Sequence, residues 1–231
     1  MIIPAKLKAG DEIRVIAPSR SATILSVEGI QQAKKRFEGL GFIVTFGKNI
    51  FHSDLHNSAP IDERIADLHE AFQDRNVKGI LTVIGGFNCN ELLPYIDYEC
   101  IRQNPKIFCG YSDITAIAIA ITAKTGLITY SGPHFSSFQM EQAQPYQTDF
   151  FKKCLMQAEI YQIHPSAQWS DDAWFWIKII ESLKRRIGKY IAKGELVHNY
   201  LEGISVLLTC CKELNICQAS EERYYLLRMT K

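Results

Sequence analysis

With 231 residues, the chain is long enough for one sizeable domain, or for one domain and a further segment. Its 47% hydrophobic and 22% charged residues are typical of a globular protein, and its formal net charge of +1 provides no basic surplus for binding nucleic acid or anionic membranes. No segment approaches the roughly 18 apolar residues of a membrane span, and the N-terminus lacks the pattern of a signal peptide, so we expect a cytoplasmic protein.

The first 130 residues alternate between strand-like and helix-like segments. In chain order, the patterns predict a strand at 12–17, a helix at 27–40, a strand at 42–46, a helix at 61–72, a strand at 79–84, a helix that begins at 90–95, a strand at 106–109, a helix at 114–124 and a short strand at 127–130. Apolar strands separated by helices predict an α/β fold, with a flavodoxin-like parallel sheet covered by helices on both faces.

Polar and glycine-rich segments follow three of these strands, at 85–86, 110–113 and 131–134. In parallel sheets, ligands bind at the carboxyl ends of the strands. Ser112 stands between a strand and a helix, where its Oγ would project from the sheet and the N–H of Asp113 would lie in the first helical turn. This arrangement is similar to a nucleophile elbow with half of an oxyanion hole, although a serine that merely caps the helix is the alternative.

The other two segments allow a functional and a structural interpretation. Gly85 and Gly86 let the backbone come close to a ligand or adopt positive φ, and they could provide a second oxyanion N–H, but a simple tight turn fits equally. His134 follows the strand at 127–130 and either lines the cleft or belongs to a structural turn. We do not assign it as the general base.

Neither the seven cysteines nor the histidines suggest a metal site. The cysteines lack zinc-type spacing, so we expect reduced and mostly buried thiols. Among the histidines, His52, His56, His69 and His164 show no grouping typical of metal ligands.

Four motifs in order carry a family resemblance: GDEIRVIAPS at 10–19, RIADLHEAFQD at 64–74, IGGFNCNELLPYIDY at 84–98 and GYSDIT at 110–115. They resemble the N-terminal domain of the LD-carboxypeptidase family of serine peptidases, over residues 1 to about 175. The segment GGFNCN followed by LLPYIDY is more similar to the microcin C self-immunity branch than to the murein-recycling branch.

This resemblance implies a serine peptidase with a Ser-Glu-His triad and no metal or organic cofactor. Ser112 matches the nucleophile, and the backbone N–H groups of Asp113 and Gly86 match the oxyanion hole. The glutamate and the histidine would come from a second, C-terminal domain. The substrate would be a small peptide cleaved before D-alanine, or an aminoacyl or peptidyl group joined to a sulfamoyl or phosphoramidate nucleotide. A homodimer is also implied.

Further residues near these motifs are candidates for substrate contact, with an exposed-loop role as the alternative. They are Gly85, Phe87, Asn88, His134, Trp174 and the acidic pair Asp171-Asp172. Trp174 lies in the segment WSDDAWF at 169–175, which resembles the family's substrate-side loop.

The resemblance stops after Phe175, where the family's glycine-glycine-asparagine turn and its leucine-glutamate-aspartate motif are absent. Reading the encoded codons in a shifted frame permits GGNLCT, LLQGTEYMP and ILFLEDDE, three family motifs in order, so we hypothesise a frameshift. The expected organisation is then a nucleophile-bearing domain at 1–165, the start of an inter-domain segment at 166–175 and an out-of-frame tail at 176–231.

If the tail is out of frame, the chain lacks the Glu and His of the triad, and we expect it to be inactive as encoded. Two other interpretations remain open. One is a non-catalytic α/β module that binds a ligand in the same cleft. The other is a flavodoxin-like nucleotide-binding protein, although neither GxGxxG nor GxxxxGK[ST] follows the first strand.

Overall fold

The computed structural model describes residues 1–140 and 144–167. Its sheet has the strands β1 (Glu12–Ile16), β2 (Ile43–Phe46), β3 (Val77–Thr82) and β4 (Ile107–Cys109), in the order β2-β1-β3-β4. Every pair in this sheet is parallel, with Val15 opposite Phe46 on one side and Leu81 on the other. The predicted parallel sheet is confirmed.

In the described part of the chain, five α-helices lie between or beside the strands: α1 (Val27–Gly39), α2 (Ile61–Gln73), α3 (Tyr98–Gln103), α4 (Thr115–Thr125) and α5 (Gln144–Leu155). Shorter 3-10 turns lie between them: η1 (Ala22–Ile24), η2 (Cys89–Tyr95), η3 (Ser112–Ile114) and η4 (Phe135–Gln139). No helix among the described residues is long and apolar enough to cross a membrane.

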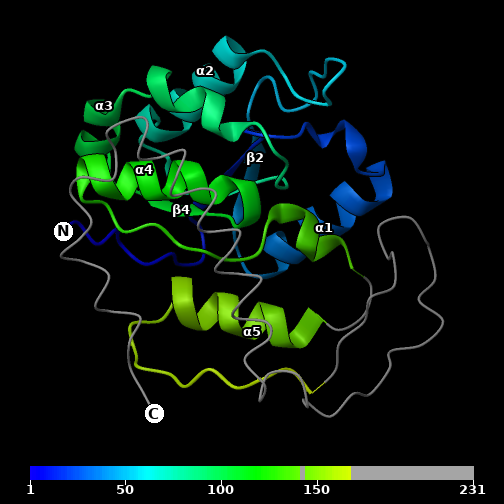
Figure 1. Ribbon diagram of the computed structural model, residues 1–231. Coiled ribbons are helices and arrows are strands. Elements are labelled where there is room, and N and C mark those ends of the chain that lie inside the picture. The colour runs from blue at the N-terminus through cyan, green and yellow to red at the C-terminus, as the bar shows by residue number, and fades with distance from the viewer. Residues whose placement is uncertain (141–143, 168–231) are drawn as a thin grey trace, which may run out of the picture.

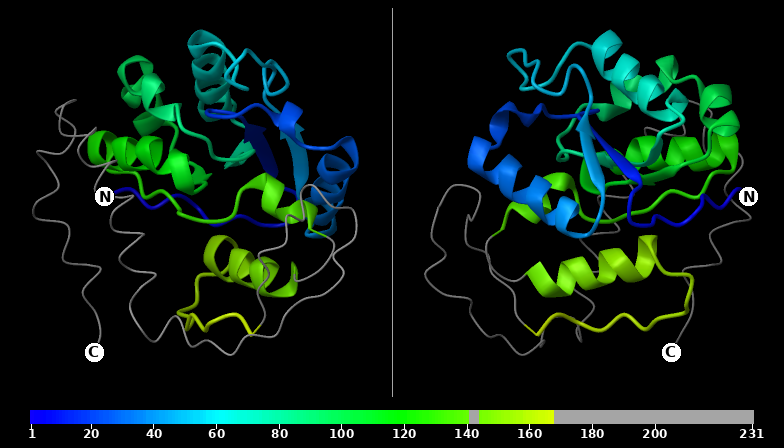
Figure 2. Two further views of the ribbon diagram at one scale, coloured as in Figure 1. Left: turned by 45° about the vertical axis from the view of Figure 1, so that its right-hand side comes forward. Right: turned by 180° about the vertical axis from the view of Figure 1, so that it is seen from behind.

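The helices form two layers, one on each face of the sheet (Figures 1 and 2). One layer contains α2, η2, α3 and α4, which bury Phe72, Leu92 and Ile117 against Phe108 of the sheet. The other layer contains α1, η4 and α5, whose core includes Phe37 and Phe138. The sheet is buried on both faces because apolar side chains from successive strand positions enter both cores, as expected for parallel α/β folds.

Four local features differ from the sequence patterns. The segment at 90–95 forms the 3-10 turn η2 rather than the start of an α-helix, and Pro94, which lacks an N–H, lies inside it. Residues 127–130 form only isolated bridges, because Leu127 pairs with Ile2 and Tyr130 pairs with Cys109 of β4, so no single neighbouring strand runs beside the whole segment. The patterns also missed α3, a short helix capped by Asp97, and α5, which buries few apolar residues.

Parallel strands end on the same edge of the sheet, so the loops that follow β1, β3 and β4 meet there. These loops carry Ser19 and Arg20, Gly85 to Asn88, and Tyr111 to Asp113. The site described below lies at this edge.

Candidate functional site

Ser112 has a strained backbone at the turn between β4 and α4. Its φ is 61°, and only Asn57 shares a positive φ among the non-glycine residues that the structure describes. Holding a non-glycine residue in this region costs on the order of 1–3 kcal/mol. The side chain is exposed, and the chain continues through η3 directly into α4. This strained strand-to-helix turn with an exposed hydroxyl has the local geometry of a nucleophile elbow.

The turn is tight because its neighbours come very close. A Cβ at Gly110 would lie 2.3 Å from Thr82 Oγ1 and 2.9 Å from Ile114 Cγ2. Only glycine fits there, and this allows the backbone to reverse sharply before Ser112.

Gly85 and Gly86 lie directly against the turn. A Cβ at Gly85 would be 3.1 Å from Ser112 Oγ and 3.5 Å from His134 Nε2, and one at Gly86 would be 2.1 Å from Ser19 Oγ. Neither glycine has a positive φ. Of the two reasons that the sequence offered for glycine here, close backbone approach therefore applies and positive φ does not.

The Asp113 carboxylate connects three loops. Its Oδ2 accepts a hydrogen bond from Ser19 Oγ at 2.6 Å and another from the Cys89 N–H at 3.0 Å. Ser19 is fully buried, and its hydroxyl also lies 3.2 Å from Asn88 Oδ1. Asp113 thus fixes the loop after β3, which contains Gly86, relative to the Ser112 turn.

Asn88 and Phe87 differ in their exposure to solvent. Asn88 is buried and hydrogen-bonded to Ser58 and Ser19, so its amide organises the loop from inside. Phe87 is 58% exposed and is the more accessible of the two for contact with a ligand.

His134 is buried at the N-terminal end of η4. Its Nδ1 lies 2.7 Å from Thr82 Oγ1, and its ring stacks on Tyr111 with 4.3 Å between the ring centroids. Burial lowers the pKa of His134 to about 4, a shift that the Tyr111 carbonyl opposes. Its Nε2 is buried without a hydrogen-bond partner in the described part of the chain. The ring is therefore neutral at pH 7, with Nε2 near Gly85.

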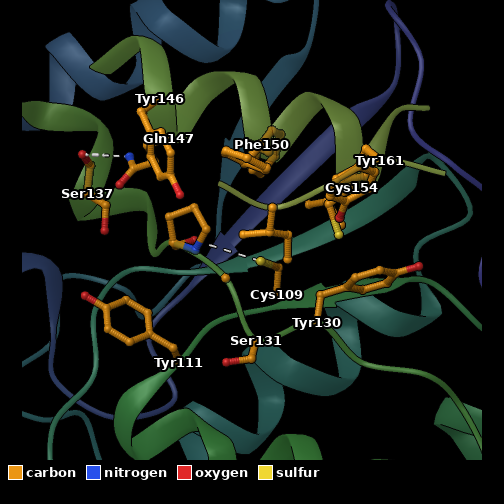
Figure 3. A pocket seen from close by; sticks show the side chains of 15 residues that line it. Cys109, Tyr111, Tyr130, Ser131, Ser137, Tyr146, Gln147, Phe150, Cys154 and Tyr161 are labelled. Carbon is orange, nitrogen blue, oxygen red and sulfur yellow. Dashed lines mark hydrogen bonds between the residues drawn. The ribbon is translucent and has the colours of Figure 1, made fainter. Parts of the chain in front are cut away.

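An aromatic pocket of about 490 Å³ adjoins this site (Figure 3). Tyr111 and Ser131 border it below in this view, and Tyr146 and Phe150 of α5 border it above, with Cys109 at its centre. Burial raises the pKa of the Cys109 thiol to about 12, so this thiol is not a nucleophile at neutral pH. Tyr111, which also stacks on His134, connects the pocket to the Ser112 turn.

The structure therefore brings together Ser112, Asp113, Gly85, Gly86 and His134, while Trp174 and the pair Asp171-Asp172 lie outside the described residues. Residues 1–140 and 144–167 contain no group of three side chains that could hold a metal ion. Sequence reasoning missed Ser19, Arg20 and Thr82. Ser19 and Arg20 follow a strand just as the other candidates do, so the same strand-end argument could have found them.

The comparisons with known proteins point to one family. The model of the LD-carboxypeptidase N-terminal domain matches residues 13–132. YocD of Bacillus subtilis, a carboxypeptidase by name, is 46% identical over 219 residues, which cover 94% of this chain and 65% of YocD.

Two solved structures share the fold of the described domain. An MccF-like protein from Bacillus anthracis is 52% identical with a TM-score of 0.79, over 80% of this chain and 56% of that protein. The microcin C7 self-immunity protein MccF, in complex with aspartyl sulfamoyl adenosine, is 32% identical with a TM-score of 0.77, over 82% of this chain and 58% of MccF.

The chain thus spans less than two thirds of the length of each of these three proteins. The matched region contains β1 except for Glu12, all of β2 to β4, the strained Ser112 turn and the Gly85-Gly86 loop. By this match, the chain belongs to the LD-carboxypeptidase family, and residues 13–132 correspond to its N-terminal domain.

Proposed function

We propose that this domain carries the nucleophile of a serine hydrolase that cleaves a peptide or aminoacyl amide near a carboxyl terminus. The observation that carries the proposal is the positive φ of Ser112, at an exposed strand-to-helix turn with the Gly85 backbone against its Oγ. A strained turn of this kind presents a hydroxyl to a substrate and brings backbone N–H groups close to it.

In the proposed reaction, Ser112 Oγ attacks the carbonyl carbon of the scissile amide and loses its proton to a general base. The carbonyl oxygen becomes an oxyanion, which accepts hydrogen bonds from the N–H groups of Gly86 and Asp113. Within the described residues, the Gly86 N–H donates no backbone hydrogen bond outside the helices and strands, and the Asp113 N–H lies in the first turn of η3, where N–H groups lack partners within the helix. The amine then leaves with a proton, and water hydrolyses the acyl-enzyme to release the acid and free Ser112.

The base and its orienting acid are proposed to be the His and the Glu, respectively, of a second domain, as the family resemblance implies. No described side chain is hydrogen-bonded to Ser112 Oγ, and the buried His134 bonds to Thr82 instead. A nucleophile without its base loses several orders of magnitude in rate in comparable triads. We therefore expect very weak turnover from a chain that lacks those two residues.

The substrate class is proposed from the relatives. MccF has been solved with aspartyl sulfamoyl adenosine and with glutamyl sulfamoyl guanosine, and the family model is named for LD-carboxypeptidases. We propose an aminoacyl or peptidyl nucleotide as the first candidate substrate and a murein-type peptide ending in D-alanine as the second. We also propose a homodimer, which the family resemblance implies, and a cytoplasmic location, which is the expectation from the sequence.

Labelling with a fluorophosphonate tests whether Ser112 is an activated nucleophile. Because the base would come from the second domain, we expect slow labelling of the wild-type chain, and Ser112→Ala should lose that label, since the probe bonds covalently to a reactive serine. Ser131→Ala is the matched control, since Ser131 is an exposed serine close to the same strand end. Equal labelling of the wild type and Ser112→Ala would rule out Ser112 as the nucleophile.

The second candidate function is a non-catalytic binding module, favoured by the lack of any described base hydrogen-bonded to Ser112. Such a module would bind aspartyl sulfamoyl adenosine without releasing aspartate, and its Ser112 would not be labelled. Calorimetry combined with an assay for free aspartate separates the two functions.

A further inference from the structure

Arg20 differs from the other buried or half-buried arginines near the sheet. Arg14 forms ion pairs with Glu12 and Asp74, both at 3.0 Å, and Arg64 pairs with Glu91 at 2.8 Å. Arg20 is half-buried, has no carboxylate partner among the described residues, and its Nε is buried without a hydrogen-bond partner there. A half-buried cation without an anion is energetically costly, which calls for an explanation.

The position of Arg20 supplies the explanation, because the residue lies at the edge of the candidate site. Its Cγ would be 3.1 Å from a Cβ at Gly86, whose N–H belongs to the proposed oxyanion hole. Its guanidinium carbon lies 5.6 Å from the ring centroid of Phe87, a cation–π distance. Its neighbour Ser19 is hydrogen-bonded to Asp113, so the backbone of this loop is fixed to the Ser112 turn.

We propose that Arg20 binds an anionic group of the substrate and that the Phe87 ring holds the guanidinium in place for it. This inference rests on the proposed function and deepens it, because it assigns a charge to the substrate beside the scissile bond. A guanidinium presents a planar fork of donors that matches two oxygens of a carboxylate or a phosphoryl group. Both proposed substrate classes carry such a group, either a terminal carboxylate or the phosphoryl oxygens of a phosphoramidate nucleotide.

Two matched ligand pairs test the proposal on the full chain by calorimetry at low salt. The first pair is adenosine monophosphate and adenosine, which differ in a phosphate. The second pair is a dipeptide ending in D-alanine and the same dipeptide with a carboxyl-terminal amide. We expect the wild type to bind the anionic member of one pair roughly 10- to 100-fold more tightly than the neutral member, and that pair identifies the anion source.

Arg20→Gln should abolish this preference and leave the affinity for the neutral member unchanged. Arg102→Gln is the control, because it also removes one arginine charge, from the exposed Arg102–Glu99 pair on α3, and it should keep the preference. Arg20→Lys retains the charge but not the fork of donors, and should keep only part of the preference. Because a lysine side chain preserves much of the packing, this variant serves as the test if Arg20→Gln fails to fold.

Three results would overturn the proposal: no preference for either anion in the wild type, an unchanged preference in Arg20→Gln, or an equal loss in Arg102→Gln. Fluorophosphonate labelling of the same preparations separates this proposal from the proposed function. Labelled Ser112 with an anion preference that does not depend on Arg20 removes only the role of Arg20. Labelling that Ser112→Ala retains in full removes the nucleophile role of Ser112 and with it the proposed hydrolase function, whatever the binding data show.

Discussion

At the residue scale, the chemistry of the site depends on a few side chains held in unusual environments. Ser112 adopts a positive φ, and His134 is buried with its Nε2 unpaired among the described residues. Both features cost free energy, and costs of this kind concentrate at functional sites. His134 lies too deep to act as a surface histidine, and its hydrogen bond to Thr82 fixes its ring.

The lowered pKa of His134 predicts a specific loss of stability in acid. Its pKa falls from 6.5 to about 4 on folding, so the unfolded chain binds the proton first as the pH drops. The contribution of the neutral ring is complete above pH 6.5 and is lost as the pH falls towards 4. Between pH 7 and pH 5, this titration should lower the free energy of unfolding by about 2 kcal/mol.

Urea unfolding of the wild type and of His134→Gln at pH 7 and pH 5 measures this effect. The variant cannot titrate at this position, so its free energy of unfolding should fall less between the two pH values. Identical pH dependence in both proteins would show that His134 is not neutral and buried in the folded state.

At the element scale, an aromatic cluster holds η4 and therefore His134. The ring of Phe37 on α1 lies 5.9 Å from Phe135, 4.4 Å from Phe138 and 5.5 Å from Phe151 of α5, measured between centroids. Residue 134 precedes η4 directly, so the contact of α1 with η4 sets where the histidine lies. The connection between this core and the site was not visible in the sequence, because these phenylalanines are far apart along the chain.

Replacing Phe37 by alanine should destabilise the domain by about 3–5 kcal/mol, because the side chain is 1% exposed and its removal leaves a cavity. Thermal or urea unfolding measures the loss, with Phe51→Ala as the control, since Phe51 is 52% exposed. We also expect Phe37→Ala to keep most of its Ser112 labelling while it remains folded. Ser112 directly precedes α4, which belongs to the helical layer opposite α1. A loss below 1 kcal/mol would mean that this cluster does not anchor η4.

At the scale of the whole molecule, residues 168–231 lie outside the described residues. Whether the tail is in frame can therefore be argued only from the sequence. The frameshift hypothesis assigns 176–231 to another reading frame. The match with YocD covers 94% of the chain and so extends beyond residue 175, which weighs against a tail without any family-like residues. The boundaries at 165 and 175 remain predictions.

Sequencing the gene from the codon for Asp171 to well beyond that for Lys231 decides the matter. The hypothesis predicts an additional T near Phe175, followed by an open frame through the LEDD motif to a downstream histidine. A confirmed tail with no family-like sequence in the other frame would reject it, and Ser112 would then belong to a relative without that triad.

The sequence by itself determined the class of fold, because the periods of apolar residues and the glycine stops are local properties of strands and helices. Strand-end reasoning also located Ser112 and the Gly85-Gly86 loop at one edge of the sheet. Only the tertiary structure placed the Asp113 carboxylate against Ser19, buried His134 beside Thr82 and left Arg20 without a described carboxylate partner. These contacts join the loop after β1, the end of β3, the turn after β4 and the residue before η4. Long-range contacts of this kind depend on how the chain folds rather than on any local pattern.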